Sequence, residues 1–191
     1  MPQPAKRPRK DAQANRDAIL AVARDEFANN GLDVSMDKIA KAAGVGAGTL
    51  YRHFPNRELL FGAVLEGCAP NVAAEGARLE SADDAAEAVE RWLAVIAEWS
   101  TSYDGAAAPM RDAINGQDSP LTATCDDMVT TLQRLLDNAQ RTGAARAGVD
   151  ARELYLATLG MSWAAENGGE STTLLALLRR GWAAPPHSET T

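Results

Sequence analysis

The residues best suited to chemistry lie in one short stretch, "GVGAGTLYRHF", residues 44–54. Three glycines within five residues lead into a short helical segment that carries Thr49, Tyr51, Arg52 and His53. Hydroxyls, an imidazole and a guanidinium are groups that donate hydrogen bonds to anionic oxygens. Their types and spacing favour binding to phosphate rather than covalent catalysis.

The charge of the chain is divided unevenly. Residues 1–57 contain ten Lys/Arg and six Asp/Glu, a net charge of +4, whereas residues 58–191 contain nine and twenty, a net charge of −11. This asymmetry indicates a basic module attached to an acidic body, although the whole chain carries −7. A basic tail without a partner would explain the cations before residue 11, but not Lys38, Lys41, Arg52 and Arg57.

Four helices over residues 12–68 are predicted to position the stretch. The first carries an apolar face and ends at Gly31, which favours the left-handed backbone that closes helices. Ser35 can cap the second helix with its hydroxyl, and Gly44 ends that helix after about two turns. The face of the first helix consists of Ile19, Leu20, Ala23 and Phe27.

The third helix is predicted over residues 47–53, with Leu50 and Phe54 as its inward-facing pair. Asn56 can then cap a fourth helix that runs to about Cys68. Two short helices joined by a glycine turn form the helix-turn-helix signature. In that arrangement the second helix enters the major groove of duplex DNA.

The second short helix carries side chains suited to DNA. Gly46 and Gly48 allow the start of the helix to approach the duplex, and the methyl group of Ala47 suits a thymine methyl. Thr49 can bond a phosphate or a base edge. Phosphate contacts fix the register without reading sequence, and we assign them to Tyr51, His53 and, at the start of the fourth helix, Arg57.

The segment 16–66 resembles the DNA-binding domain of the TetR family of bacterial transcriptional regulators. The matching residues are "ILAVARDEFANNGLDVSMDKIAKAAGVGAGTLYRHFPNRELLFGAVLE", about the first third of the chain. The resemblance implies an all-α homodimer whose C-terminal domain binds a small molecule that changes DNA affinity. The chain lacks a long polar side chain at 46–48, which leaves Arg52 or the basic arm to supply specificity. By position, the resemblance implies phosphate contacts by Ser35, Thr49, Tyr51, His53 and Arg57, and base proximity for Ala47, Gly48 and Thr49.

The remainder of the chain is also predicted to be helical, so the fold class is all-α. Helices are expected to start at Ser81-x-x-Asp84, Ser119-Pro120, Asp150-x-x-Glu153 and Ser171, with ends at Gly105 and Gly143 and a short helix around Met110 and Ile114. We expect a flexible basic arm at 1–11, in which Lys6 and Arg7 contact DNA, a helix-turn-helix domain at 12–68, a ligand-binding and dimerisation domain at 69–184, and a disordered tail at 185–191.

Large apolar residues in the acidic body have two interpretations. They form an ordinary core, or some of them line a pocket for a small apolar or aromatic effector. The candidate pocket residues are Trp92, Trp99, Tyr103, Met110, Cys125, Met128 and Trp163.

The last two predicted helices are apolar over more than one face, which predicts a partner subunit on the second face. The resemblance agrees, since dimers of this family commonly form a four-helix bundle. The candidate interface residues are Leu154, Ala157, Gly160, Met161, Leu174, Leu177 and Leu178.

Several classes of function receive no support from the sequence. We expect no membrane span, no secretory signal, no metal and no cofactor, and two reduced cysteines in a cytoplasmic protein. An enzyme is the least favoured class, because no catalytic set can be built around His53 or His187. Two alternatives stay open: a ligand-responsive repressor that binds a palindromic operator as a homodimer, and an architectural DNA-binding protein without a ligand.

Overall fold

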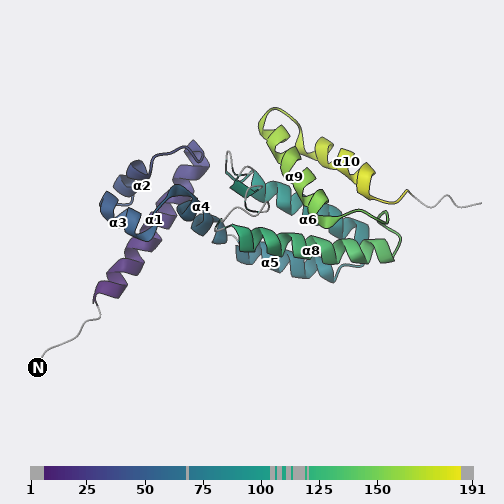
Figure 1. Ribbon diagram of the computed structural model, residues 1–191, viewed down its shortest axis with the longest axis horizontal. Helices are drawn as coiled ribbons and strands as arrows, with labels where there is room; N and C mark the ends of the chain where they lie inside the picture. The colour runs from purple at the N-terminus through teal and green to yellow at the C-terminus, as the bar shows by residue number, and fades with distance from the viewer. Residues whose placement is uncertain are drawn as a thin grey trace, which may run out of the picture. The chain divides into compact units, whose positions relative to one another are not determined.

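The computed structural model describes residues 7–67, 69–103, 106, 109–110, 113, 119 and 121–185, apart from the side chains of 7–10, 69 and 70. The chain divides into two compact units, Met1–Gly67 and Cys68–Thr191. Across the described residues the regular structure is helical, and the one β-bridge joins Ala145 to Ala183. The prediction of an all-α fold is therefore confirmed (Figure 1).

The first unit contains α1 (Arg7–Asn30), α2 (Met36–Ala42), α3 (Ala47–His53) and α4 (Arg57–Glu66). Helix α1 packs against the other three, and α2 packs against α3 (Figure 1). The core of this unit is apolar, and an edge-to-face contact between Phe27 and Phe61, with ring centroids 5.7 Å apart, joins α1 to α4. Burial of Leu50 and Phe54 confirms the predicted inward pair of α3.

Local signals explain where the helices of the first unit begin and end. The Ser35 hydroxyl accepts the Lys38 N–H at 3.2 Å, and Asn56 Oδ1 accepts the Leu59 N–H at 2.8 Å, as N-caps do. Gly31 adopts φ 70°, the left-handed conformation that ends α1. These three predictions from the sequence are confirmed.

The predicted flexible arm differs from the structure. Helix α1 begins at Arg7, so residues 7–11 are helical, and only residues 1–6 of the expected arm lie outside the described residues. Pro8 is compatible with this start, because the N–H groups of a first helical turn have no intrahelical partner. Lys6 lies outside the described residues, as does the side chain of Arg7.

The second unit contains α5 (Ala69–Glu80), α6 (Ala85–Ser100), α8 (Thr122–Arg141), α9 (Ala151–Glu166) and α10 (Ser171–Trp182). Helices α6, α8 and α9 pack against one another, α5 covers α6 and α8, and α10 lies against α6 and α9 (Figure 1). Asp150 Oδ1 accepts the Glu153 N–H at 2.9 Å, which confirms the predicted cap of α9. The predictions at 104–105, 111–112, 114–118 and 120, and those for Cys68 and for tail residues 186–191, fall outside the described residues.

Helix α5 is missing from the sequence-based prediction, because Val72 and Leu79 are the only large apolar residues in its sequence. The predicted start of the next helix at Ser81 is also wrong. Asp84 is the N-cap of α6, with Oδ1 accepting the N–H groups of Ala86 and Glu87 at 2.9 Å each. Ser81 lies in the turn between the two helices.

An exposed ion pair ties α5 to α6. The Glu75 carboxylate accepts two hydrogen bonds from Arg78 at 2.8 Å each, and Arg91 of α6 lies 3.5 Å away. The hydrogen bond from Arg78 is the main cause that lowers the pKa of Glu75 to about 2. The contribution to stability is modest, because exposed pairs are screened by solvent.

The core of the second unit contains both satisfied and unsatisfied polar groups. Trp92 Nε1 donates to the Met128 carbonyl at 3.1 Å. The Ser100 and Ser162 hydroxyls lie 2.6 Å apart, and Ser162 also donates to the Thr158 carbonyl at 3.1 Å. By contrast, the buried polar atoms without a hydrogen-bond partner include Trp99 Nε1, Thr122 Oγ1, Tyr155 Oη and Trp182 Nε1.

No helix among the described residues is long and apolar enough to cross a membrane. The same residues contain no cluster of three or more His, Cys, Asp or Glu side chains that could hold a metal ion.

Two substitutions in α9 should separate a satisfied buried hydroxyl from an unsatisfied one. Tyr155→Phe should leave the free energy of unfolding unchanged or raise it by up to about 1 kcal/mol, because the buried hydroxyl has no hydrogen-bond partner at normal distance and only the weakly bonding Cys125 thiol beside it. Ser162→Ala should lower it by about 1 kcal/mol, since it removes a bonded hydroxyl. Urea unfolding at one protein concentration measures both. A loss of 1 kcal/mol or more for Tyr155→Phe would contradict the assignment.

Candidate nucleic-acid interface and pocket

The turn between α2 and α3 depends on Gly44. Its φ of 68° is the left-handed conformation, and nothing lies within 4 Å of a Cβ placed there. The Gly44 N–H donates to the Lys41 carbonyl at 3.2 Å, and the Val45 N–H donates to the Ala40 carbonyl at 3.0 Å. This pair of bonds is the Schellman motif, so a residue at 44 with a side chain would strain the connection that sets α3 against α2.

Helix α3 has a buried face and an exposed face. Leu50 is fully buried in the core of the first unit, whereas Ala47, Gly48 and Arg52 are exposed. Tyr51 is 45% exposed, although it is a large aromatic residue. The remaining predicted contacts of this helix, Thr49 and His53, are half-buried at its flanks.

Packing within the protein does not explain Gly46 and Gly48. Neither has positive φ, and an added Cβ at either position would meet nothing within 4 Å. Glycine within a helix costs about 0.5–1 kcal/mol relative to alanine. This cost applies to Gly48, which lies within α3, whereas Gly46 is the N-cap of that helix.

The cations around α3 differ in their partners. Lys38 Nζ lies 2.6 Å from Glu26 Oε2, and Arg57 lies 3.6 Å from Asp33 while its Nε is buried without a partner. Arg16 lies over the Phe54 ring, 5.2 Å from the centroid. Among the described residues Lys41 and Arg52 form no ion pair, so both cations are open to an anionic partner.

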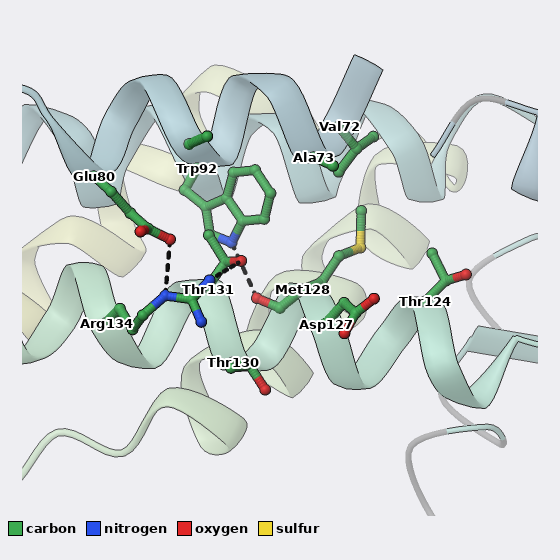
Figure 2. A pocket seen from close by; sticks show the side chains of 11 residues that line it. Val72, Ala73, Glu80, Trp92, Thr124, Asp127, Met128, Thr130, Thr131 and Arg134 are labelled. Atoms are coloured by element: carbon green, nitrogen blue, oxygen red, sulfur yellow. Dashed lines mark hydrogen bonds and ion pairs between the residues drawn. The ribbon is translucent and has the colours of Figure 1, made fainter. Parts of the chain in front are cut away.

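A cavity of about 360 Å³ lies in the second unit between α5, α6 and α8. Figure 2 shows Val72 and Ala73 on one side of it, the Met128 side chain pointing toward them, and the Trp92 ring beside them. Its lining residues are Val72, Ala73, Ala77, Glu80, Trp92, Thr124, Asp127, Met128, Thr130, Thr131 and Arg134.

Most polar groups that line this cavity, called the groove from here on, already have hydrogen-bond or ion-pair partners. Arg134 Nε donates to Glu80 at 2.8 Å, and its Nη2 donates to the Thr131 hydroxyl at 3.1 Å. The Trp92 indole N–H donates a hydrogen bond to the Met128 carbonyl (Figure 2). The carboxylate of Asp127 has no ion pair or hydrogen bond among the described residues.

The predicted pocket residues fall into three groups. Trp92 and Met128 line the groove, whereas Trp163 is 60% exposed. The residues of α5 that line the groove were not predicted, because α5 itself was not predicted. The other four predicted residues, Trp99, Tyr103, Met110 and Cys125, are buried in the core.

Cys125 is unsuited to sensing oxidants in this conformation. Burial raises the pKa of its thiol to about 11, and the neighbouring Tyr155 hydroxyl offsets this only in part. The thiol therefore remains protonated at neutral pH, whereas the thiolate is the reactive form.

The predicted interface residues lie on α9 and α10. Ala157 and Gly160 are exposed, Leu177 is 55% exposed, and Met161 is half-buried. Leu174 and Leu178 are half-buried, whereas Leu154 is buried within the unit and takes no part in the exposed surface.

Comparison with protein families matches each unit separately. Residues 19–64 match the family described as bacterial regulatory proteins, tetR family. Residues 84–184 match the family described as transcriptional regulator SbtR-like, C-terminal domain.

Individual relatives agree with the family matches. An HTH-type transcriptional regulator of Staphylococcus aureus is 48% identical over 50 residues, which cover 26% of this chain and 27% of that protein. The chain thus spans about a quarter of the length of the curated relatives it matches. Over a greater length, the chain is similar to the solved structure of a TetR transcription regulatory protein from Mycobacterium vanbaalenii. That match has 33% identity and TM-score 0.50 and covers 92% of this chain and 99% of the other.

Two further solved structures share the fold. A TetR transcriptional regulator from Streptomyces coelicolor has 28% identity and TM-score 0.59, with 88% of this chain and 98% of the other covered. The structure of RolR in complex with resorcinol has 20% identity and TM-score 0.67, with 92% and 91% covered.

Two glycine substitutions should distinguish the fold from the interface. Gly48→Ala should raise the free energy of unfolding by about 0.5 kcal/mol, because the added methyl group meets nothing in the protein. The same methyl group should lower the affinity for duplex DNA several-fold, because it would keep the helix from approaching the duplex closely. Gly44→Ala should instead destabilise the protein by about 1 kcal/mol or more, because of its positive φ. Unfolding curves and fluorescence anisotropy with labelled DNA measure the two effects. Parental DNA affinity in Gly48→Ala would show that the bare surface is not an interface.

Proposed function

The chain belongs to the TetR family of bacterial transcriptional regulators, and on this premise we propose a cytoplasmic regulator that binds a palindromic operator as a homodimer. A small molecule bound in the second unit lowers its DNA affinity, which makes the protein a repressor that is released by its effector. The observation that carries the proposal is the exposed, glycine-bearing surface of α3, which packing does not explain. The family consists of regulators and not enzymes.

In this proposal the first turn of α3 faces base edges and its flanks hold phosphates. Ala47 and Gly48 are exposed and small enough for the helix to enter the major groove. Tyr51 and His53 donate to phosphate oxygens, and the Ser35 hydroxyl, whose oxygen caps α2, still has a hydrogen to donate. The half-buried Thr49 and the exposed Arg52 extend the contact, and the predicted roles of Lys6 and Arg7 remain predictions.

Exposed apolar residues on α9 and α10 support the dimer. Leu177 is 55% exposed and Trp163 is 60% exposed, while Ala157 and Gly160 offer a surface without long side chains. Large exposed apolar groups beside small ones suit close helix packing by a second copy of the chain. A homodimer would also present two copies of α3, which is the reason for proposing a palindromic operator.

The groove between α5, α6 and α8 supports the effector. Its volume of about 360 Å³ lies in the range of small-molecule sites, and most of its lining atoms belong to apolar groups and threonine methyls. RolR, which shares the fold, was solved with resorcinol. An architectural DNA-binding protein would need no such groove, so the groove favours the ligand-responsive alternative.

Phosphate contacts predict a specific salt dependence. Tyr51→Phe and His53→Ala should each weaken binding to all DNA sequences by about 1 kcal/mol, the scale of one hydrogen bond. Arg57→Ala should also reduce the slope of log affinity against log salt by about 1. Asp33→Asn should strengthen binding, because it frees Arg57 from its ion pair. Anisotropy titrations at several salt concentrations test this, and parental behaviour in all four folded variants would exclude the assignment.

The dimer surface predicts the effect of one buried charge. Leu177→Glu should yield monomers or unfolded protein and abolish operator binding, because an unpaired charge in a seam costs several kcal/mol. Ser81→Glu, which adds the same charge at an exposed turn, is the matched control and should stay dimeric. Sedimentation velocity at micromolar concentration is the measurement. A parent protein that is monomeric there would rule out the homodimer.

A further inference from the structure

We propose that the groove between α5, α6 and α8 binds a flat apolar molecule that carries one positive charge. This rests on the proposed function, since such a cation would be the effector. The groove belongs entirely to the second unit, and its shape, its unpaired charge and its connection to the DNA-binding unit each bear on the ligand.

The shape of the groove follows from one close contact. A Cβ placed on Gly76 would lie 3.0 Å from Thr131 Cγ2 and 3.2 Å from the Trp92 ring, so α5 lies close against α8 and α6 there. The groove extends to both sides of this contact, from Val72 and Ala73, which face Met128, to Ala77 and Glu80 (Figure 2). A flat apolar body fits a slot between two helices whose walls are aliphatic side chains, an indole ring and a thioether.

The charged group without an ion pair in the described lining is negative. Arg134 is held by Glu80 and Thr131, so its cation is already neutralised. The Trp92 N–H donates to the Met128 carbonyl, and the hydroxyls of Thr124 and Thr130 are neutral polar groups of the lining. Asp127 is the one lining carboxylate without an ion pair among the described residues, so a cation is the complementary ligand group.

The surroundings of the groove reinforce the preference for a cation. Residues 68–191 contain nine Lys/Arg and eighteen Asp/Glu, a net charge of −9. The summed field of such a unit attracts cations and repels anions, most strongly at low salt. An anionic ligand would be repelled by this field. The one cation among the described residues that line the groove, Arg134, is already paired with Glu80.

The position of the groove connects it to DNA binding. Helix α5 begins at Ala69, two residues after the first unit ends at Gly67, so α5 is joined by a very short link to α4. A ligand between α5 and α8 separates helices that touch at Gly76 and acts on this link. An effect on DNA requires that the ligand bind the DNA-competent and DNA-incompetent shapes of the protein with unequal affinity.

Two ligands of the same shape test the charge preference. N-methylquinolinium is a flat aromatic cation, and 1-methylnaphthalene is its uncharged counterpart. Equilibrium dialysis against the full-length protein without DNA should show about three- to tenfold tighter binding of the cation, the range expected for one exposed carboxylate with an aromatic contact. Equal or weaker binding of the cation would overturn the proposal.

Two carboxylates that are neighbours in the sequence provide the matched variants. Asp127→Asn should remove the preference for the cation, whereas Asp126→Asn, at an exposed position that does not line the groove, should preserve it. Ala73→Trp should fill the groove and abolish binding of both compounds. A preference that survives Asp127→Asn, or binding that survives Ala73→Trp in folded protein, would place the cation elsewhere and contradict the inference.

A second measurement separates this inference from the proposed function. Anisotropy titrations with labelled operator DNA, at saturating N-methylquinolinium, should show weaker binding for the parent and no change for Ala73→Trp. Dialysis that confirms the cation site while DNA affinity stays constant would support the site and contradict the effector role. Failure in dialysis with intact DNA binding would overturn the site and leave the DNA-binding function standing.

Discussion

The left-handed backbone at Gly44 is the constraint on which the proposed DNA-binding surface depends. With φ of 68° the chain leaves α2 and enters α3 within a few residues, and the bonds from Gly44 and Val45 to α2 carbonyls hold that connection. Leu50 and Phe54 then fix the inner face of α3 against the core. The rotation of α3 about its axis follows from this pair, so the small residues at its start face outward because the apolar ones face inward.

The second unit shows a similar relation between a close contact and an open space. Gly76 lets α5 approach the Trp92 ring and Thr131, and the groove is lined by α5 residues on both sides of this glycine. Ion pairs at Glu75 and Arg134 fix the helices at their exposed edges. The unit therefore combines a packed core with a solvent-connected slot.

Local features of the structure could be predicted from the sequence, whereas those that depend on distant packing could not. Ser35, Asn56 and Gly31 determine helix ends through their own side chains or backbone, so their roles follow from neighbouring residues. Helix α5 was not predicted because its sequence has only two large apolar residues, Val72 and Leu79, and the groove that it lines was therefore not predicted either. Trp163 shows the opposite error, since size and aromaticity suggest burial but the side chain is 60% exposed.

Hydrogen–deuterium exchange is the most direct test of the claim that α3 carries the DNA contact. The full-length protein is compared with and without a duplex selected from random-sequence DNA, and exchange is followed by mass spectrometry of overlapping peptides. The account predicts slower exchange over residues 44–57, where the turn, α3 and the start of α4 would be covered by DNA. Slowing confined to residues 69–103 and 121–185, with unchanged exchange at α3, would contradict it.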